Sequence, residues 1–208
     1  MQIDPEADTK INFFRKKIYY SQPPLFAVGG INHKNNYNNQ RIISLYDLML
    51  FTDGSVDAKT RIGFGAYLAI NNMESSLADL KSKVKVKQFE NTSSTTLELQ
   101  ALLWAMDDAF LLTAEKAIRV AIYSDSQNIV GLSARRSGLE EREYCASNGK
   151  RLSNAELYTQ FFKAMDQCNC QIIKVDGHKP HQDKNDIDRI FAVVDKASRS
   201  ALREFNSM

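Results

Sequence analysis

The sequence predicts an α/β fold: a five-stranded mixed sheet, flanked by helices, whose first three strands are antiparallel. Residues 44–90 contain three apolar or alternating runs joined by short polar links, which is typical of antiparallel strands. From residue 95 onward, segments with apolar side chains at helical spacing alternate with short apolar runs. The expected order of elements is therefore βββαβαβα, a sheet with helices packed against it.

The first three strands are assigned from local patterns. LYDLMLFTD at 45–53 is expected to form a buried strand that ends at Asp53. Beyond a turn at 55–61, IGFGAYLAI at 62–70 is expected to form the second strand. In KSKVKVKQFE, at 81–90, valines alternate with lysines, which predicts a half-buried third strand.

The later elements follow in chain order. Residues 96–112 have apolar side chains at helical spacing, and the hydroxyl residues just before them can cap a helix N-terminus. The polar stretch 133–152 is expected to be rich in loops. The other expected elements are a strand at 118–125, a short helix at 127–132, a helix at 155–167 that Asn154 starts, a strand at 171–178 and a last helix at about 186–205.

Composition divides the chain in two. Residues 1–42 hold three of the four prolines and the Asn-rich stretch HKNNYNNQ, and such residues interrupt regular structure. We expect an irregular N-terminal extension over 1–42 and one folded domain over 43–208. The net charge of +2 neither requires nor excludes a nucleic acid partner.

Cysteine usage and hydropathy indicate the compartment. Three cysteines, an odd number without framework spacing, argue against a disulfide scaffold and suggest a reducing environment. Cys168 and Cys170 have no second pair with which to form a zinc site. No apolar run reaches the ~18 residues of a transmembrane helix, and the acidic N-terminus does not resemble a signal peptide. We expect a cytoplasmic protein with no membrane partner.

Three carboxylates stand where a site is expected. Asp53 and Asp125 each follow an apolar run, and Glu98 lies early in an apolar helix. Each alone can be a cap or a turn residue, but sites in α/β sheets form beyond the carboxyl ends of strands. Acids that converge repel one another unless a cation lies between them. Oxygen ligands without His or Cys favour magnesium or manganese.

Together these motifs resemble bacterial type 1 ribonuclease H over about residues 46–205. The resemblance rests on TDGS at 52–55, the Glu98 helix, SDSQ at 124–127, and GH at 177–178 before an acid-bearing last helix. It implies a ribonuclease H-like fold and an endoribonuclease that hydrolyses the RNA strand of RNA–DNA hybrids. It also implies two Mg²⁺ ions per site, with Mn²⁺ as the alternative, and products with 5′-phosphomonoester ends.

The resemblance implies the catalytic residues. Asp53, Glu98 and Asp125 correspond to three of the metal ligands. For the fourth ligand, Asp195 in VVDKASR resembles the family's Asp, small residue, Arg pattern better than Asp188, so we expect Asp195. His178 corresponds to the family's loop histidine, which can shuttle a proton or assist product release.

Substrate contacts are predicted at the same edge. Hydroxyl and N–H groups of Ser93, Ser94 and Thr95 can hold a phosphate at the helix N-terminus, although plain capping explains them equally well. Gln127 can reach a base edge or a 2′-hydroxyl. Gly54 and Ser55 of the TDGS motif are predicted contacts too. Some family members carry a basic handle near 133–152, and we place Arg135 and Arg136 there, although neighbouring glutamates make a solvated loop the alternative.

Two other functions stay open. One is a nuclease of the same fold that acts on another nucleic acid; an exonuclease is disfavoured because Gly54 and Ser55 follow Asp53, where exonucleases have Asp-x-Glu. The other is a non-catalytic module that binds nucleic acid or protein, which is disfavoured because every expected catalytic position has a candidate. We expect a monomer, or a dimer formed through residues 1–42.

Overall fold

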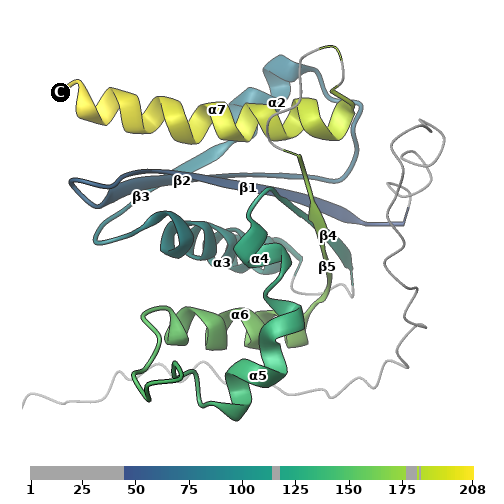
Figure 1. The fold of residues 1–208 in the computed structure, drawn as a ribbon. Coiled ribbons are helices and arrows are strands. Elements are labelled where there is room, and N and C mark those ends of the chain that lie inside the picture. The colour runs from purple at the N-terminus through teal and green to yellow at the C-terminus, as the bar shows by residue number, and fades with distance from the viewer. Residues whose placement is uncertain (1–44, 114–117, 177–181, 183) are drawn as a thin grey trace, which may run out of the picture. The chain divides into compact units, whose positions relative to one another are not determined.

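The computed structural model describes residues 45–113, 118–176, 182 and 184–208. The predicted extension over 1–42 and the predicted catalytic residue His178 lie outside these ranges. The described part is an α/β domain with one five-stranded sheet and helices on both faces, as Figure 1 shows. This architecture confirms the fold class expected from the sequence.

The sheet has the order β3-β2-β1-β4-β5. Its strands are β1 (Leu48–Asp57), β2 (Ile62–Ile70), β3 (Lys85–Phe89), β4 (Arg119–Ser124) and β5 (Asn169–Lys174). The β1–β2 and β2–β3 pairs are antiparallel, whereas β1–β4 and β4–β5 are parallel. Parallel neighbours need long crossovers, which the helices after β3 and β4 supply.

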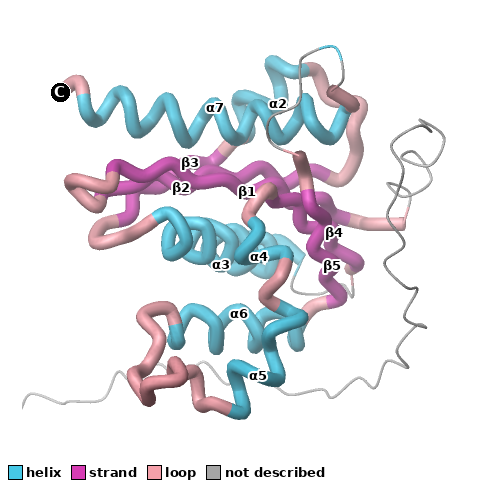
Figure 2. Tube along the Cα trace, in the orientation of Figure 1, coloured by secondary structure: helices cyan, strands magenta, loops and turns pink. Residues whose placement is uncertain are grey.

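Helices form layers on both sides of the sheet, as Figures 1 and 2 show. One face is covered by α3 (Ser94–Thr113), with α6 (Ala155–Gln167) packed behind it, and the other by α7 (Asp186–Asn206) and α2 (Leu77–Lys83). The connection after β4 contains α4 (Gln127–Val130), a 3-10 turn (Ser133–Arg135) and α5 (Arg136–Glu141). Of the helices that the structure describes, none is long and apolar enough to cross a bilayer.

The central strands bury side chains on both faces. Leu50 and Ile122 belong to the core beneath α3, whereas Met49 and Phe51 belong to the core beneath α7. Successive side chains of a strand point to opposite faces, so the continuous apolar run of β1 fills both cores. Each fully buried side chain of this size contributes about 1.5–3 kcal/mol of transfer free energy.

The sequence predicted that the first strand ends at Asp53, but the strand is longer. It continues to Asp57, and Asp53 pairs with Ala66 inside the β1–β2 ladder. The turn is confined to residues 58–61, where Arg61 adopts a positive φ of 58° and its N–H donates to the Asp57 carbonyl at 2.8 Å. Asp53 is therefore held on a rigid strand rather than on a strand tip.

Two other assignments were wrong in part. The third strand was expected over 81–90, but residues 77–83 form α2, because the Ser76 hydroxyl caps its N-terminus by accepting from the Asp79 N–H at 3.2 Å. The remaining strand, β3, lies at the sheet edge and is largely exposed rather than half-buried. The stretch 133–152 begins with the 3-10 turn and α5, because Leu139 packs into the core.

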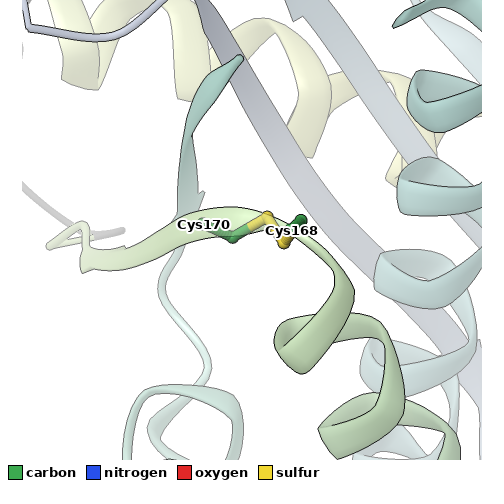
Figure 3. The surroundings of a disulfide bond; sticks show 2 residues. All are labelled: Cys168 and Cys170. Carbon is green, nitrogen blue, oxygen red and sulfur yellow. A yellow bond between two sulfur atoms is a disulfide. The ribbon is translucent and has the colours of Figure 1, made fainter. Parts of the chain in front are cut away.

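A disulfide joins Cys168 and Cys170 where α6 passes into β5, as Figure 3 shows. This bond was not expected from the sequence. The two Cα atoms lie 5.3 Å apart, a separation that a disulfide can span. The bond joins residues only two positions apart and does not connect distant elements, so it is not a scaffold. Cys145 is a free cysteine.

Candidate active site

Three of the predicted acids converge on one recess. Asp53 projects from β1, Glu98 from the second turn of α3, and Asp125 directly follows β4. They line a narrow recess together with Thr52, Ser124 and Ile129. The parallel register explains part of this: Phe51 pairs with Tyr123, so Asp53 and Asp125 each lie two residues beyond the same rung of the ladder.

Glycines in the sheet let α3 bring Glu98 close. A Cβ atom on Gly54 would lie 2.9 Å from Leu97 Cγ, and one on Gly63 would lie 2.7 Å from Leu97 Cδ2. Gly65 makes the same kind of room for Ala101, at 2.8 Å from its Cβ. Leu97 is fully buried in this close contact, and Glu98 is the next residue. Gly54, predicted to contact substrate, therefore has a packing role that positions an acid.

A serine hydroxyl orients Glu98. Ser126 Oγ donates to Glu98 Oε2 at 2.5 Å and accepts from the Ile129 N–H at 3.3 Å, so it also caps α4. Burial raises the pKa of Glu98, the Ser126 hydrogen bond opposes this, and the charge of Asp125 adds to the rise. Ser94, a predicted substrate contact, also hydrogen-bonds to Glu98 and lowers its pKa.

Asp53 is the most perturbed acid of the site. Burial, the largest cause, raises its pKa to about 6, and the charges of Asp125 and Asp195 push in the same direction. Hydrogen bonds from Ser198 and from the Gly54 backbone lower the pKa, but they offset only part of the rise. Ser198 Oγ donates to Asp53 Oδ2 at 2.5 Å. Burial and the neighbouring negative charges therefore disfavour the ionised form of Asp53.

The two candidates for the fourth acid lie in different surroundings. Asp195 lies on α7 one turn before Ser198, its charge acts on Asp53, and its carboxylate forms an ion pair with Arg199 at 2.7 Å. Asp188 is buried at the start of α7, where it forms a capping box with Asn185. The structure thus places Asp195 beside Asp53 and gives Asp188 a capping role.

The donor set fits a hard divalent cation. Within the described ranges, no three Asp, Glu, His or Cys side chains are arranged closely enough to form a metal centre as they stand. The four acids nevertheless offer only carboxylate oxygens, which suit Mg²⁺ or Mn²⁺. The charges of Asp125 and Asp195 raise the pKa of Asp53, and that of Asp125 raises the pKa of Glu98, repulsion that a cation would relieve.

A polar cluster surrounds the N-terminus of α3. Ser93 Oγ accepts from the Thr96 N–H at 3.4 Å and contacts Thr96 Oγ1 at 2.8 Å, so Ser93 caps the helix. Thr96 Oγ1 donates to Asn154 Oδ1 at 3.0 Å, and Asn128 Nδ2 donates to Thr95 Oγ1 at 3.1 Å. Hydroxyl and amide groups from three segments thus gather at one positive helix end.

Several residues of the site were not expected from the sequence. Ser126 and Ser198, which hold two of the acids, were not singled out, and neither was Asn154. Asn154 precedes a helix and therefore resembles an N-cap, but its side chain makes no cap hydrogen bond and contacts Thr96 instead. Among the other predicted contacts, Gln127 is exposed at the start of α4, and Ser55 lies two residues beyond Asp53 on the same face of β1.

The two predicted handle arginines make internal contacts. Arg136 donates two hydrogen bonds to Asp166, at 2.6 and 2.8 Å, and a third to Glu140 at 2.8 Å. Its guanidinium also lies 5.0 Å from the centre of the Phe162 ring. Arg135 donates to the Asn128 carbonyl at 2.8 Å. These contacts hold Arg136 between α5 and α6, and we propose this structural role as the alternative to the predicted substrate handle.

A protein-family model matches most of this chain. The family model described as RNase H matches residues 46–196, a range that contains all four acids. No curated protein sequence matches the chain. The bacterial type 1 subgroup expected from the motifs stays a prediction.

Solved structures show the same fold. The solution structure of the PFV RNase H domain is 15% identical with a TM-score of 0.58, and the match covers 74% of this chain and 93% of that one. Prototype foamy virus protease-reverse transcriptase is 16% identical with a TM-score of 0.60, over 76% of this chain and 21% of that one. A foamy viral protease-reverse transcriptase in complex with an RNA/DNA hybrid is 10% identical with a TM-score of 0.59, over 95% and 23%.

Proposed function

The chain belongs to the RNase H family, and we propose that it is an endoribonuclease that hydrolyses the RNA strand of RNA–DNA hybrids. One observation carries this proposal: acids from separate elements gather at one place. Asp53, Glu98 and Asp125 line a single recess, and the charge of Asp195 acts on Asp53. Such a cluster is costly for folding and is therefore typical of a functional site.

We propose that these four acids hold two Mg²⁺ ions, with Mn²⁺ as the alternative. Divalent ions bound there would supply Lewis-acid stabilisation of a phosphodiester and a more acidic water. The protein's part is to fix the oxygen ligands before any ion arrives. Ser198 holds Asp53, and Ser126 holds Glu98, each at 2.5 Å. Ligands oriented in this way lose little freedom on binding a cation.

The polar cluster at the start of α3 is our candidate for substrate binding. Exposed Ser93 and Ser94 lie at the N-terminus of a 20-residue helix, where backbone N–H groups favour a phosphate. Gln127, exposed two residues after Asp125, can reach a base edge or a 2′-hydroxyl. A structural neighbour binds an RNA/DNA hybrid, which supports this class of substrate.

The remaining assignments are proposals from the sequence. His178 would move a proton or assist product release from its loop. Products would carry 5′-phosphomonoester ends, and the enzyme would act as a cytoplasmic monomer. The clustering of the acids depends on none of these features. Disproving any one of them would therefore leave the central proposal intact.

A substrate panel tests the reaction. The chain is incubated with Mg²⁺ and an end-labelled RNA–DNA hybrid, with duplex RNA, duplex DNA and the single strands in parallel. We expect internal cuts in the RNA strand of the hybrid only. Cleavage of duplex DNA instead would favour another nuclease on this fold. No cleavage of any substrate with Mg²⁺ or Mn²⁺ would favour a binding module.

A further inference from the structure

We infer that Ser198 is a positioning residue that fixes the carboxylate of Asp53 for cation binding, an inference that rests on the proposed function. Ser198 was not predicted from the sequence, and neither the fold nor the family match assigns it a role. Its hydroxyl is the group through which α7 holds Asp53 of β1.

The position of Ser198 leaves little freedom to its side chain. Ser198 is fully buried, and its Oγ lies 2.5 Å from Asp53 Oδ2 and 3.0 Å from the backbone oxygen of Asp195. A serine hydroxyl has one proton, so it can donate fully to only one of these acceptors. The carboxylate is both nearer and negatively charged, and it is therefore the favoured acceptor.

This hydrogen bond restricts the orientation of the Asp53 carboxylate. Oδ2 accepts from the buried Ser198 hydroxyl, and the Gly54 backbone also hydrogen-bonds to this carboxylate. A carboxylate held by one oxygen cannot rotate freely about its Cβ–Cγ bond. The Asp53 carboxylate is therefore oriented before any cation is bound.

The same hydroxyl contacts two acids that lie on different elements. Ser198 follows Asp195 by three residues, and side chains at that spacing lie on the same face of a helix. The hydroxyl touches Asp53 and the backbone of Asp195 at once. It thereby ties β1 to the turn of α7 that carries Asp195, although the charges of the two acids oppose their approach.

The test replaces Ser198 and a matched serine on the same helix. Ser198→Ala removes the donor without adding volume, and alanine favours a helix. Ser200→Ala is the control, because Ser200 is exposed on α7 and gains the same helix propensity. Thermal unfolding confirms that both variants fold. Mn²⁺ binding is then measured by calorimetry on the full chain, without substrate, and the Mg²⁺ concentration that gives half-maximal cleavage is measured separately.

Ser198→Ala is expected to weaken Mn²⁺ binding about 10-fold, the low end for losing a partner of a metal ligand. It should raise the half-maximal Mg²⁺ concentration in parallel, and Ser200→Ala should match wild type. Adding Ser198→Ala to Asp53→Asn should change Mn²⁺ binding no further, because Ser198 acts through Asp53. A purely structural serine would lower the unfolding temperature without these effects.

The outcomes separate this inference from the proposed function. Wild-type Mn²⁺ affinity in Ser198→Ala overturns the positioning role alone. Weaker Mn²⁺ binding in Ser198→Ala, together with a wild-type chain that cuts no hybrid, supports the positioning role and contradicts the nuclease proposal. A wild-type chain that binds no Mn²⁺ overturns both.

Discussion

Asp188 and Asn185 close a reciprocal capping box at the start of α7. The Asp188 carboxylate accepts from the Asn185 N–H at 3.1 Å, and Asn185 Oδ1 accepts from the Asp188 N–H at 2.8 Å. Asp195 lies seven residues later, two turns along the same helix, where its charge acts on Asp53. The helix α7 thus carries Asp188, which caps its N-terminus, and Asp195, which faces the candidate site.

This arrangement predicts opposite effects of two matched substitutions. Asp188→Ala removes a capping interaction and should lower the free energy of unfolding by about 1 kcal/mol while hybrid cleavage persists. Asp195→Ala should reduce cleavage at least about 100-fold, as expected for the loss of several kcal/mol of transition-state stabilisation, and should leave stability nearly unchanged. Urea unfolding and initial cleavage rates measure the two effects. The reverse pattern would make Asp188 the fourth acid.

Gly54→Ala should impair both stability and cleavage. The new Cβ would lie 2.9 Å from Leu97 Cγ, so α3 must move and displace Glu98. Overpacking of this kind costs about 1–3 kcal/mol. Gly138→Ala, within α5, is the control, because its Cβ would meet only the side chain of Arg142, the residue after that helix, at 3.5 Å. It should be neutral or slightly stabilising. Equal cleavage rates in the two variants would contradict the proposed role of Gly54.

Stability without metal should fall as the pH rises through the range in which Asp53 ionises. The folded pKa of Asp53, about 6, exceeds its ordinary value of 3.8, so the folded state binds more protons between these values. Unfolding free energy therefore decreases from about pH 4 to pH 6, by up to about 3 kcal/mol, and stays lower above that window. Urea titrations in EDTA measure this slope.

Asp53→Asn is the matched variant for that titration. It should remove most of the decrease in stability between about pH 4 and pH 6, because the amide does not ionise. It should be more stable than wild type at pH 7 without metal, and yet cut no hybrid. An unchanged slope in Asp53→Asn would show that another group causes the pH dependence.

Arg136→Ala should destabilise the protein without weakening substrate binding. It removes the paired hydrogen bonds to Asp166 and the contact with Phe162. These groups are largely exposed, so we expect a loss of only about 1 kcal/mol. The KM for the hybrid and its salt dependence should stay near wild type. A clear rise in KM would restore the handle role that the sequence suggested.

Strong local periodicity explains what the sequence predicted well. The bounds of β2 and α6 agree with the predicted ones. The patterns that predict them, an apolar run and an amphipathic helical spacing, lie within short segments of the sequence. Asp53, Glu98 and Asp125 were predicted to be near one another because each is an acid beside an apolar element, and the structure brings all three to one recess. The metal-ligand roles stay predictions.

Contacts between distant residues explain what the sequence could not supply. Ser198 and Asp53 are 145 positions apart, and Thr96 and Asn154 are 58 apart, so no local pattern marks either pair. The helix α2 was missed because alternating lysines over 81–87 satisfy a strand period, while the cap that starts the helix depends on Ser76. Tertiary packing decides between such patterns.

Strand-specific cleavage of an RNA–DNA hybrid tests the central claim most directly. Wild type and Asp125→Asn are compared in Mg²⁺ on a hybrid labelled on both strands, with Asp107→Asn, exposed on α3, as the control. We predict that wild type and Asp107→Asn cut the RNA strand at equal rates, leave the DNA intact, and that Asp125→Asn cuts neither. Equal cleavage by Asp125→Asn, or none by wild type, would contradict the assignment of this acid cluster as the centre of a hybrid-cleaving nuclease.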